Sequence, residues 1–337
     1  MATVRTRRVT SADVAREAGV SRTTVSYVLN DTPHQKIPEE TRRRVLDAVA
    51  RLEYAPSAAA RTLQRGRSDT VLCLLPDWPI GPAVGASLEH LSAALTEQGL
   101  TLLAHPSAGS SRALAGAWRS VSPAAVVLFE DADEEDLAAM RAEGIQVTVA
   151  LLAGGGGGAG ARRGALEIPQ QRAGRLQAEH LAAAGHRRLG YAFPADPRVA
   201  GFAEPRLAGV RAACADLGLD DPVVLTVPLD IEAAKGAVAT WRDAGVTAVC
   251  AYNDDVALAL LTGVRRSGLA VPGDLAVIGF DDIPGAAVAD PPLTTVTTDH
   301  RAIAEHIAQM IVHGLEGREA PLRPGSDVVG LVRRDSA

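Results

Sequence analysis

Residues 13–30 read Asp13-Val14-Ala15-Arg16-Glu17-Ala18-Gly19-Val20-Ser21-Arg22-Thr23-Thr24-Val25-Ser26-Tyr27-Val28-Leu29-Asn30, and this stretch decides the fold of the first part of the chain. Thr10 is placed to cap a helix, and Asp13 three residues on completes a capping-box pattern. Gly19 can end that helix in the left-handed conformation that glycine adopts at little cost. Ser21 can then accept from the free N–H groups that open a second helix. The stretch predicts two helices around a tight turn.

An apolar cluster is expected to hold the two helices at a fixed angle, and it consists of Val14, Ala15, Ala18, Val20, Val25 and Leu29. Arg22, Thr23, Ser26 and Tyr27 of the second helix lie outside this cluster, so its polar side is free to contact another molecule. This is the helix-turn-helix arrangement, whose second helix enters the DNA major groove. An ordinary helical hairpin is the alternative that turn chemistry alone leaves open.

A third helix is expected from Pro38-Glu39-Glu40 onward, with Val45, Val49 and Leu52 on the face that closes a three-helix headpiece. Its three consecutive arginines, 42–44, fit either phosphate contacts or a solvated face. Beyond Pro56, residues 57–66 favour a helix of only eight or nine residues, which is too short to be stable alone in water. We therefore expect this segment to be helical only against a partner or a nucleic acid.

The charge of the chain is unevenly distributed. Residues 1–67 hold 13 Lys and Arg against 7 Asp and Glu, whereas the whole chain of 337 residues has a net charge of −6. A small basic part joined to an acidic body fits a module that binds a polyanion.

From about Ser68 onward, apolar strands alternate with helices. The expected strands are 71–75, 100–104, 124–129, 147–152, 189–193, 223–227, 248–252 and 275–280, and the expected helices include 86–98, 171–184, 206–217, 231–242 and 256–267. This alternation predicts parallel sheets covered on both faces. Eight such strands suit two doubly wound lobes, with a ligand at the carboxyl ends of the strands in the cleft between them.

Composition restricts the class of protein. There is no apolar run of the ~18 residues that a membrane span requires, and no apolar segment follows the positively charged N-terminus as in a secretory signal. The three cysteines, Cys73, Cys214 and Cys250, are far apart among apolar residues, which favours reduced core thiols in a cytoplasmic protein. No residue pattern of an enzyme or a metal site is found, and no cofactor is expected.

The chain resembles transcriptional repressors of the LacI/GalR (lactose-repressor-like) family along nearly its whole length. The stretches that carry the likeness are Asp13-Val14-Ala15, Ala18-Gly19-Val20-Ser21, Thr24-Val25-Ser26, Leu29-Asn30, Tyr54-Ala55-Pro56-Ser57-Ala58-Ala59-Ala60-Arg61-Thr62-Leu63, Glu179-His180-Leu181, Gly185-His186-Arg187, Arg206-Leu207-Ala208-Gly209, Asn253-Asp254, Val271-Pro272, Gly279-Phe280-Asp281-Asp282-Ile283-Pro284 and Pro291-Pro292-Leu293-Thr294-Thr295-Val296. The resemblance implies a periplasmic-binding-protein-like body behind the DNA-binding headpiece.

The resemblance implies roles in DNA binding for ten residues. Arg22, Thr23 and Tyr27 match positions that read base edges, where an arginine can hold guanine O6 and N7. The positions that match phosphate-contacting or supporting residues are Thr10, Ser21, Thr24, Ser26 and Asn30. Leu63, in the short helix that also contains Ala59, matches the leucine that family members insert into the minor groove at the operator centre. That geometry requires a homodimer on near-palindromic double-stranded DNA.

For the body, the resemblance implies that Arg206, Asn253 and Asp281 contact a small-molecule effector, which is expected to be sugar-like. Asp77 and Trp78 also match ligand-contacting positions, although a simple loop role for both stays open. Between Leu152 and Gln171 the sequence departs from the family, because a glycine-rich tract and Pro169-Gln170 stand where the family carries polar ligand groups. The pocket is therefore altered, or the response to an effector has been lost.

These observations define the following hypothesis. Residues 1–56 form the headpiece, 57–67 a hinge helix, and 68–337 an effector-binding and dimerisation domain with lobes of about 68–166 plus 298–323 and 167–297 plus 324–337. The protein is expected to be a cytoplasmic, nucleoid-associated repressor, not an enzyme. An effector-independent regulator and a regulator dependent on a nucleobase-type co-repressor are the alternatives. A non-specific DNA binder and a two-lobed secreted protein or enzyme are the rival classes.

Overall fold

The structure is a computed structural model that describes residues 9–29, 36–54, 68–75, 77–106, 111–129, 134–145, 147–152, 165–167, 169–319 and 328–337. The chain divides into two compact units, Met1–Ser68 and Asp69–Ala337, and each is described by itself. The predicted helix-turn-helix, and parallel sheets covered by helices, are both present, which confirms the predicted fold class.

The smaller unit contains helices α1 (Ser11–Ala18), α2 (Arg22–Leu29) and α3 (Glu39–Arg51). The carboxylate of Asp13 accepts from the backbone N–H of Thr10 at 2.9 Å, and Gly19 ends α1 at φ 65°. The Ser21 hydroxyl accepts from the N–H of Thr24 at 3.0 Å and so caps α2. The turn therefore forms by the capping chemistry that the sequence predicts.

The core of the smaller unit differs from the expected cluster at the turn and at two helices, since the expected Val20, Val49 and Leu52 are only partly buried beside it and Ala48 of α3 is buried instead. Its fully buried members are Val14, Ala15, Ala18, Val25, Val28, Val45 and Ala48. Val28 lies in this core, whereas the expected Leu29 is only half-buried beside it. Residues 25 and 28 are three apart and thus share one face of α2.

The larger unit contains a five-stranded parallel sheet in the order β2-β1-β3-β4-β5. Its strands are β1 (Thr70–Leu75), β2 (Thr101–Pro106), β3 (Ala125–Leu128), β4 (Val147–Leu152) and β5 (Ala165–Glu167). Helices α5 (Pro82–Glu97) and α13 (His300–Leu315) pack on the face that presents Cys73. Helices α6 (Ser111–Val121) and α7 (Glu134–Ala142) pack on the face that presents Leu72.

A second sheet has the order β11-β10-β9-β8-β6-β7 and is parallel except at β11. Its strands are β6 (Leu189–Pro194), β7 (Val223–Val227), β8 (Ala248–Ala251), β9 (Ala276–Phe280), β10 (Thr294–Thr298) and β11 (Val329–Val332). Helices α8 (Gln170–Ala183) and α9 (Ala200–Asp216) cover one face. Helices α10 (Ile231–Asp243) and α11 (Asp254–Arg266) cover the other, and α12 (Pro284–Val288) follows β9.

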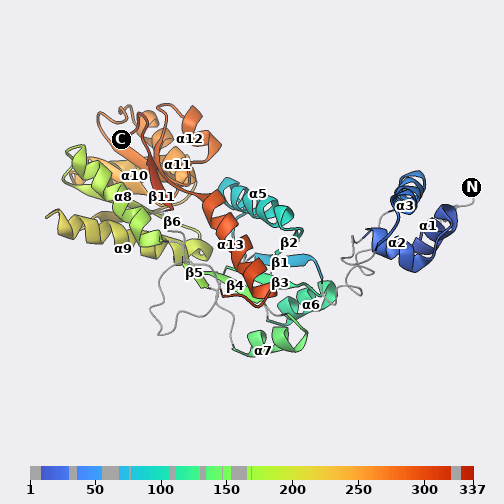
Figure 1. Cartoon of the computed structure of the whole chain (residues 1–337). Coiled ribbons are helices and arrows are strands. Elements are labelled where there is room, and N and C mark those ends of the chain that lie inside the picture. The colour runs from blue at the N-terminus through green and yellow to red at the C-terminus, as the bar shows by residue number, and fades with distance from the viewer. Residues whose placement is uncertain are drawn as a thin grey trace, which may run out of the picture. The chain divides into compact units, whose positions relative to one another are not determined.

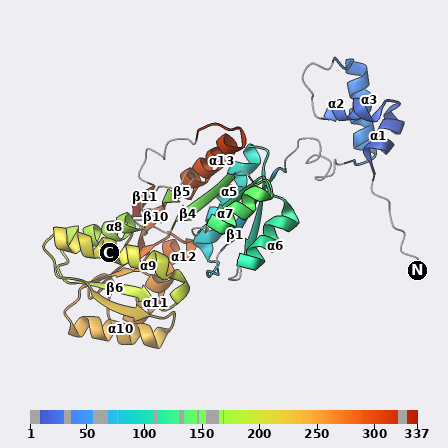
Figure 2. The ribbon, with the colours of Figure 1, turned by 90° about the horizontal axis from the view of Figure 1, so that it is seen from below.

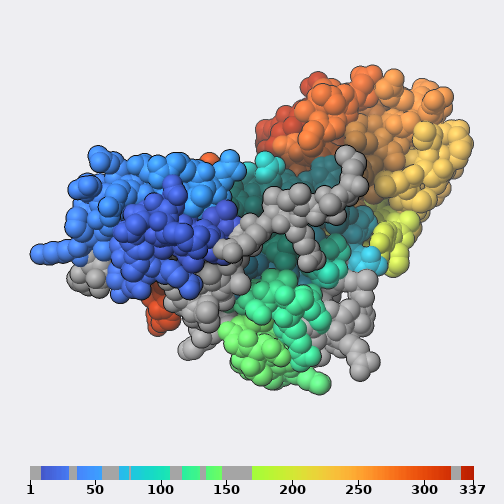
Figure 3. Space-filling model, turned by 90° about the vertical axis from the view of Figure 1, so that its right-hand side faces the viewer, coloured from blue at the N-terminus to red at the C-terminus, as the bar shows by residue number. Residues whose placement is uncertain are grey.

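The two sheets form two lobes that exchange segments of the chain. Although α13 follows β10 of the second sheet, it packs beside α5 in the first lobe (Figure 1 and Figure 2). The chain then returns to the second sheet as β11. In the space-filling view, the cyan-to-green and the yellow-to-orange parts of this unit form separate regions of the surface (Figure 3). A helix of the first lobe is therefore inserted in the sequence between two strands of the second sheet.

All eight predicted strands are present, but β5, β10 and β11 were not predicted. The predicted helix 206–217 begins earlier, at Ala200, and contains Pro205. Cys73, Cys214 and Cys250 are buried and unpaired, and burial raises the pKa of the Cys73 thiol to about 12. They are therefore core thiols, as expected.

Two glycines allow the closest helix contact in the second lobe. A Cβ at Gly174 of α8 would lie 1.9 Å from the carbonyl oxygen of Arg206, and a Cβ at Gly209 of α9 would lie 1.9 Å from that of Gln171. Both obstacles are backbone atoms, which cannot rotate away. Only glycine therefore fits at these two positions without a shift of α8 against α9.

We expect Gly209→Ala to lower the free energy of unfolding by about 3 kcal/mol, because the added methyl forces the two backbones apart. Gly236→Ala in α10 is the matched control, since nothing lies within 4 Å of a Cβ there. It should raise stability by roughly 0.5–1 kcal/mol through helix propensity. Urea denaturation measures both, and an equal effect of the two substitutions would contradict the interpretation.

Candidate functional site

The predicted DNA-reading residues of the smaller unit are distributed along α2. Arg22 and Thr23 are exposed at its first turn, whereas Ser26 and Tyr27 are half-buried. These side chains lie outside the core formed by Val25 and Val28. An exposed polar first turn on the second helix is what base-edge contact in a major groove requires.

The residues expected to support α2 interact with one another. The Thr10 hydroxyl donates to the Asp13 carboxylate at 2.7 Å, and the hydroxyls of Ser21 and Thr24 are 2.9 Å apart. These contacts fix the start of each helix and thus the direction in which α2 presents Arg22. Asn30, Ala59, Leu63 and the hinge segment 57–67 lie outside the described residues, and their roles stay predictions.

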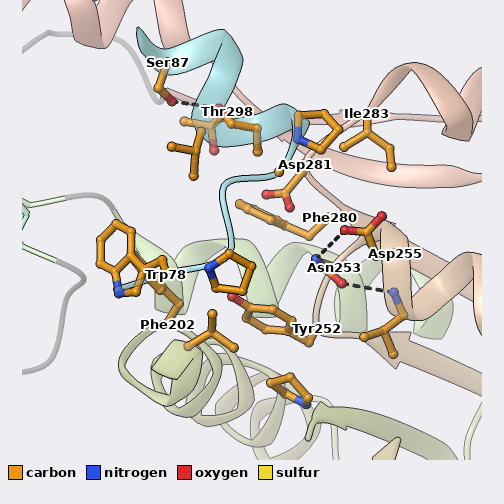
Figure 4. A pocket seen from close by; sticks show the side chains of 18 of the residues that line it. Trp78, Ser87, Phe202, Tyr252, Asn253, Asp255, Phe280, Asp281, Ile283 and Thr298 are labelled. Carbon is orange, nitrogen blue, oxygen red and sulfur yellow. Dashed lines mark hydrogen bonds between the residues drawn. The ribbon is translucent and has the colours of Figure 1, made fainter. Parts of the chain in front are cut away.

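A cavity of about 580 Å³ lies between the two lobes of the larger unit. Its lining includes four of the five predicted effector-contacting residues, namely Trp78, Arg206, Asn253 and Asp281. Figure 4 shows Trp78 on one side of the cavity and Asn253 with Asp255 on the other. The volume falls in the range of sites that bind small organic molecules.

Arg206 is held rigidly at the base of this cavity, with only 5% of its surface exposed. Its Nε donates to Gln170 Oε1 at 2.7 Å, and its Nη1 donates to the carbonyl of Tyr252 at 2.8 Å. The guanidinium also lies 3.7 Å from the centre of the Phe280 ring. Hydrogen bonds and a ring face together hold the group in position, which leaves Nη2 for a ligand.

Asp281 follows β9 in a conformation that non-glycine residues rarely adopt. Its φ is 111° and that of Asp282 is 52°. Its side chain points into the cavity in Figure 4, whereas Asp282 pairs with Arg334 at 2.6 Å. Strained backbone of this kind persists where surrounding contacts impose it. The turn thus directs one carboxylate of the adjacent pair into the cleft.

The buried carboxylate of Asp254 imposes that turn. It accepts from the Thr295 hydroxyl at 2.6 Å and from the backbone N–H of Ile283 at 2.9 Å. It also fills the space beside Gly279, where a Cβ would lie 2.0 Å from its Oδ1. Burial raises the pKa of Asp254 to about 6 and that of Asp281 to about 7. Two acids are therefore held near the cleft at a cost in stability.

Asn253 and Asp255 begin α11 beside the cavity. The side-chain oxygen of Asn253 accepts from the N–H of Val256 at 3.0 Å and caps the helix. Its amide nitrogen lies 3.5 Å from a carboxylate oxygen of Asp255. The Asp255 carboxylate thus faces the cavity as a hydrogen-bond acceptor, while its neighbour Asp254 is buried.

Trp78 and Asp77 are adjacent in the sequence, but only Trp78 lines the cavity. Trp78 makes edge contacts with Phe129 of the first lobe and Phe202 of the second, at ring distances of 5.2 and 4.7 Å. Asp77 is exposed and does not line the cavity; it pairs with Arg198 of the second lobe at 3.3 Å. Asp77 thus bridges the lobes outside the cavity, and Trp78 bridges them at its wall.

Some lining residues were not anticipated from the sequence, above all Gln170 and Phe280, which hold Arg206. The sequence predicts that the family's polar ligand groups are missing around Pro169-Gln170, yet Gln170 supplies a buried amide there. Gln170 is the first residue of α8, and its contact with Arg206, 36 residues further along the chain, cannot be read from the spacing of residues in the sequence.

The described residues contain neither a metal-binding cluster nor a membrane-spanning helix. Within the described ranges, no group of three or more His, Cys, Asp or Glu side chains could hold a metal ion. No helix in the part of the chain that the structure describes is both long and apolar enough to span a bilayer.

Each of the two units contains a segment that matches a known protein family. Residues 10–57 match the family model of bacterial regulatory proteins of the lacI family, and residues 178–337 match the periplasmic binding protein-like domain. The HTH-type transcriptional regulator GntR of Pseudomonas aeruginosa is 32% identical over 325 residues, covering 93% of this chain and 91% of the relative. The HTH-type transcriptional repressor PurR of Vibrio vulnificus is 28% identical over 336 residues, covering 97% and 98%. The chain belongs to the LacI family, and it is a DNA-binding transcriptional regulator rather than an enzyme.

Solved structures agree on the fold. A Lac repressor dimer bound to operator and the anti-inducer ONPF superposes with a TM-score of 0.78 at 23% identity, over 98% of this chain and 99% of that one. The complex of the transcriptional regulator CelR with cellobiose superposes with a TM-score of 0.66 at 27% identity, over 98% and 100%.

We expect the larger unit to lose stability as the pH rises. The folded-state pKa values of Asp254 and Asp281, about 6 and 7, exceed the ordinary 3.8. The folded state thus holds these protons more tightly than the unfolded chain, and the associated stability, complete below pH ~4, is lost as the pH passes through these values. Asp281→Asn should flatten this slope and raise stability at pH 8 by about 1 kcal/mol.

The matched control is Asp282→Asn, which removes the charge that pairs with Arg334. It should lower the melting temperature and leave most of the slope in place, because Asp282 is only a minor contributor to the raised pKa of Asp254. Thermal unfolding between pH 5 and pH 8 measures both variants, and an unchanged slope in Asp281→Asn would contradict the assignment.

Proposed function

We propose that the protein is a homodimeric repressor that reads a near-palindromic operator through α2 and whose operator affinity depends on a small molecule bound between the lobes. The observation that carries this proposal is the exposed polar first turn of α2, with Arg22 and Thr23, in a chain that also encloses an inter-lobe cavity with charged side chains. Family membership supports the first half, and the complex of the relative CelR with cellobiose supports a sugar-like ligand for the second.

In this proposal, binding energy is divided between phosphate contacts and base readout. Ser21, Thr24 and Ser26 stand at the start of and along α2, where they support the helix or contact phosphates and fix its register. Arg22, Thr23 and Tyr27 supply the contacts that distinguish one base pair from another. Two copies of the headpiece would then occupy successive major grooves of a symmetric site.

Effector control would act through the inter-lobe cavity. A ligand that contacts Arg206 and Asp281 of the second lobe together with Trp78 of the first binds one lobe angle better than another. Such a difference shifts the population of operator-competent dimers, and a coupling of about 1–3 kcal/mol changes occupancy several-fold or more. A nucleobase-type co-repressor would bind in the same cavity but would raise operator affinity rather than lower it.

Arg22→Ala is expected to weaken binding to the selected operator by roughly 1–3 kcal/mol while changing binding to scrambled DNA far less. Arg43→Ala, an exposed arginine of α3, is the matched control for the loss of one charge and should weaken both DNAs about equally. The operator is first selected from a random library with the full chain, and gel shifts then measure both variants. If Arg22→Ala weakened both DNAs equally, or if no operator were selected, specific readout by α2 would be refuted.

Leu63→Ala is expected to lower operator affinity at least tenfold, because the insertion of a leucine at the centre of the site holds the bent duplex. Leu46→Ala, which removes the same atoms from an exposed leucine of α3, should leave affinity nearly unchanged. Fluorescence anisotropy with labelled operator measures both, and wild-type affinity of the Leu63 variant would eliminate the minor-groove contact.

A further inference from the structure

The inter-lobe cavity carries charged side chains on one side only, although apolar residues such as Val199, Phe202 and Ile283 line that side as well. Its charged side chains lie on elements of the second lobe, and they include Arg206, Asp255 and Asp281. The opposite wall is formed by α5 and α13 of the first lobe, which present Val84, Leu88, Leu91, Ile303, Ala304 and Ile307. A ligand that spans the cavity therefore meets hydrogen-bonding groups at one end and hydrocarbon at the other.

The polar atoms on the first-lobe side are engaged with each other. Ser87 Oγ lies 3.0 Å from the carbonyl oxygen of Ala83 and 3.0 Å from His300 Nδ1. Burial lowers the pKa of His300, so its ring is neutral at pH 7. These contacts engage the Ser87 hydroxyl and one of the two ring nitrogens of His300. A hydroxylated ligand would therefore find few hydrogen-bonding partners where it faces α5 and α13.

Aromatic side chains are concentrated around the same cavity. The chain has only three Trp, four Tyr and four Phe. Five of them line the site, namely Trp78, Phe129, Phe202, Tyr252 and Phe280. Trp78 and Phe129 belong to the first lobe and the other three rings to the second, so aromatic rings flank the cavity from both lobes and favour a flat or bulky apolar group.

We propose that the ligand of this cavity is amphipathic: a hydroxyl- or amine-bearing end binds Arg206, Asn253 and Asp281, and an aryl or alkyl body packs against α5 and α13. The inference rests on the proposed function, since it takes the cavity to be the effector site. It narrows that function by excluding a small, evenly hydroxylated molecule as the preferred ligand. The acids at the polar end also disfavour a carboxylate or phosphate there.

Matched pairs of probes test the apolar body separately from the polar end. The full chain is titrated calorimetrically with phenyl and methyl β-D-glucopyranoside, with phenyl and methyl β-D-galactopyranoside, and with N6-benzyladenosine and adenosine. In at least one pair the aryl member should bind at least tenfold more tightly, a difference of about 1.4 kcal/mol. The gain comes from apolar surface removed from water against Leu88 and its neighbours.

Two substitutions test whether that gain in affinity arises at the first-lobe wall. Leu88→Asn should reduce the ratio between aryl and methyl members to below threefold, while Leu217→Asn, an exposed leucine outside the cavity, should leave it unchanged. Should Leu88→Asn fail to fold, Val84→Thr makes the same test with nearly unchanged volume, because Val84 lines the cavity half-buried. An aryl advantage that survives in the folded variant overturns the proposal.

Two further outcomes also overturn it, namely equal affinity within every pair and no binding of any aryl member. The operator gel shift distinguishes failure of the amphipathic-ligand hypothesis from failure of the proposed function. A chain that selects an operator but prefers methyl glycosides remains the proposed regulator with a different ligand. A chain that binds aryl probes without selecting an operator keeps the amphipathic site and loses the proposed function.

Discussion

The close contact between α8 and α9 sets the geometry on which the cleft depends. At Gly174 and Gly209 the two helices approach so closely that a single methyl group would meet backbone carbonyls at 1.9 Å. Since Arg206 stands one turn before Gly209, and Gln170 stands at the start of α8, this contact also brings the amide to the guanidinium. A preorganised arginine loses little conformational entropy when a ligand binds, which is how a rigid helix pair becomes part of a binding site.

The second lobe also holds groups that reduce its own stability. Asp254 is buried, Asp281 is directed into the cleft, and two consecutive residues have positive φ. Neither acid has a neighbouring charge that fully compensates its burial, since burial is the largest influence on both pKa values. Such features are typical of sites that are selected for binding rather than for stability.

The path of the chain explains how a ligand in the cleft could influence another part of the molecule. The helix α13 belongs to the first lobe by its packing, yet both of its neighbouring strands, β10 and β11, belong to the second sheet. His300 and Ile303 of this helix line the cavity. A ligand that presses against α13 therefore acts on an element that both lobes share, which is a physical route for coupling that needs no long chain of side chains.

The sequence alone determined the features that depend on local chemistry and periodicity. The capping pattern at Thr10 and Asp13, the glycine at position 19 and the serine at position 21 predicted the helix-turn-helix correctly. Apolar strands alternating with helices predicted two covered parallel sheets. These signals act over a few residues, so they can be recognised without a structure.

Tertiary structure decided the rest. The strands β10 and β11 are short and gain their identity from pairing with β9 and with each other across the chain. The helix α9 continues through Pro205 because its packing against α8 outweighs one lost backbone hydrogen bond. The contact between Gln170 and Arg206, 36 residues apart, arises only when α8 packs on α9, and the placement of charged side chains on one side of the cavity arises only when the two lobes form one cleft. No local pattern encodes such contacts, because the free energy that selects them comes from partners distant in sequence.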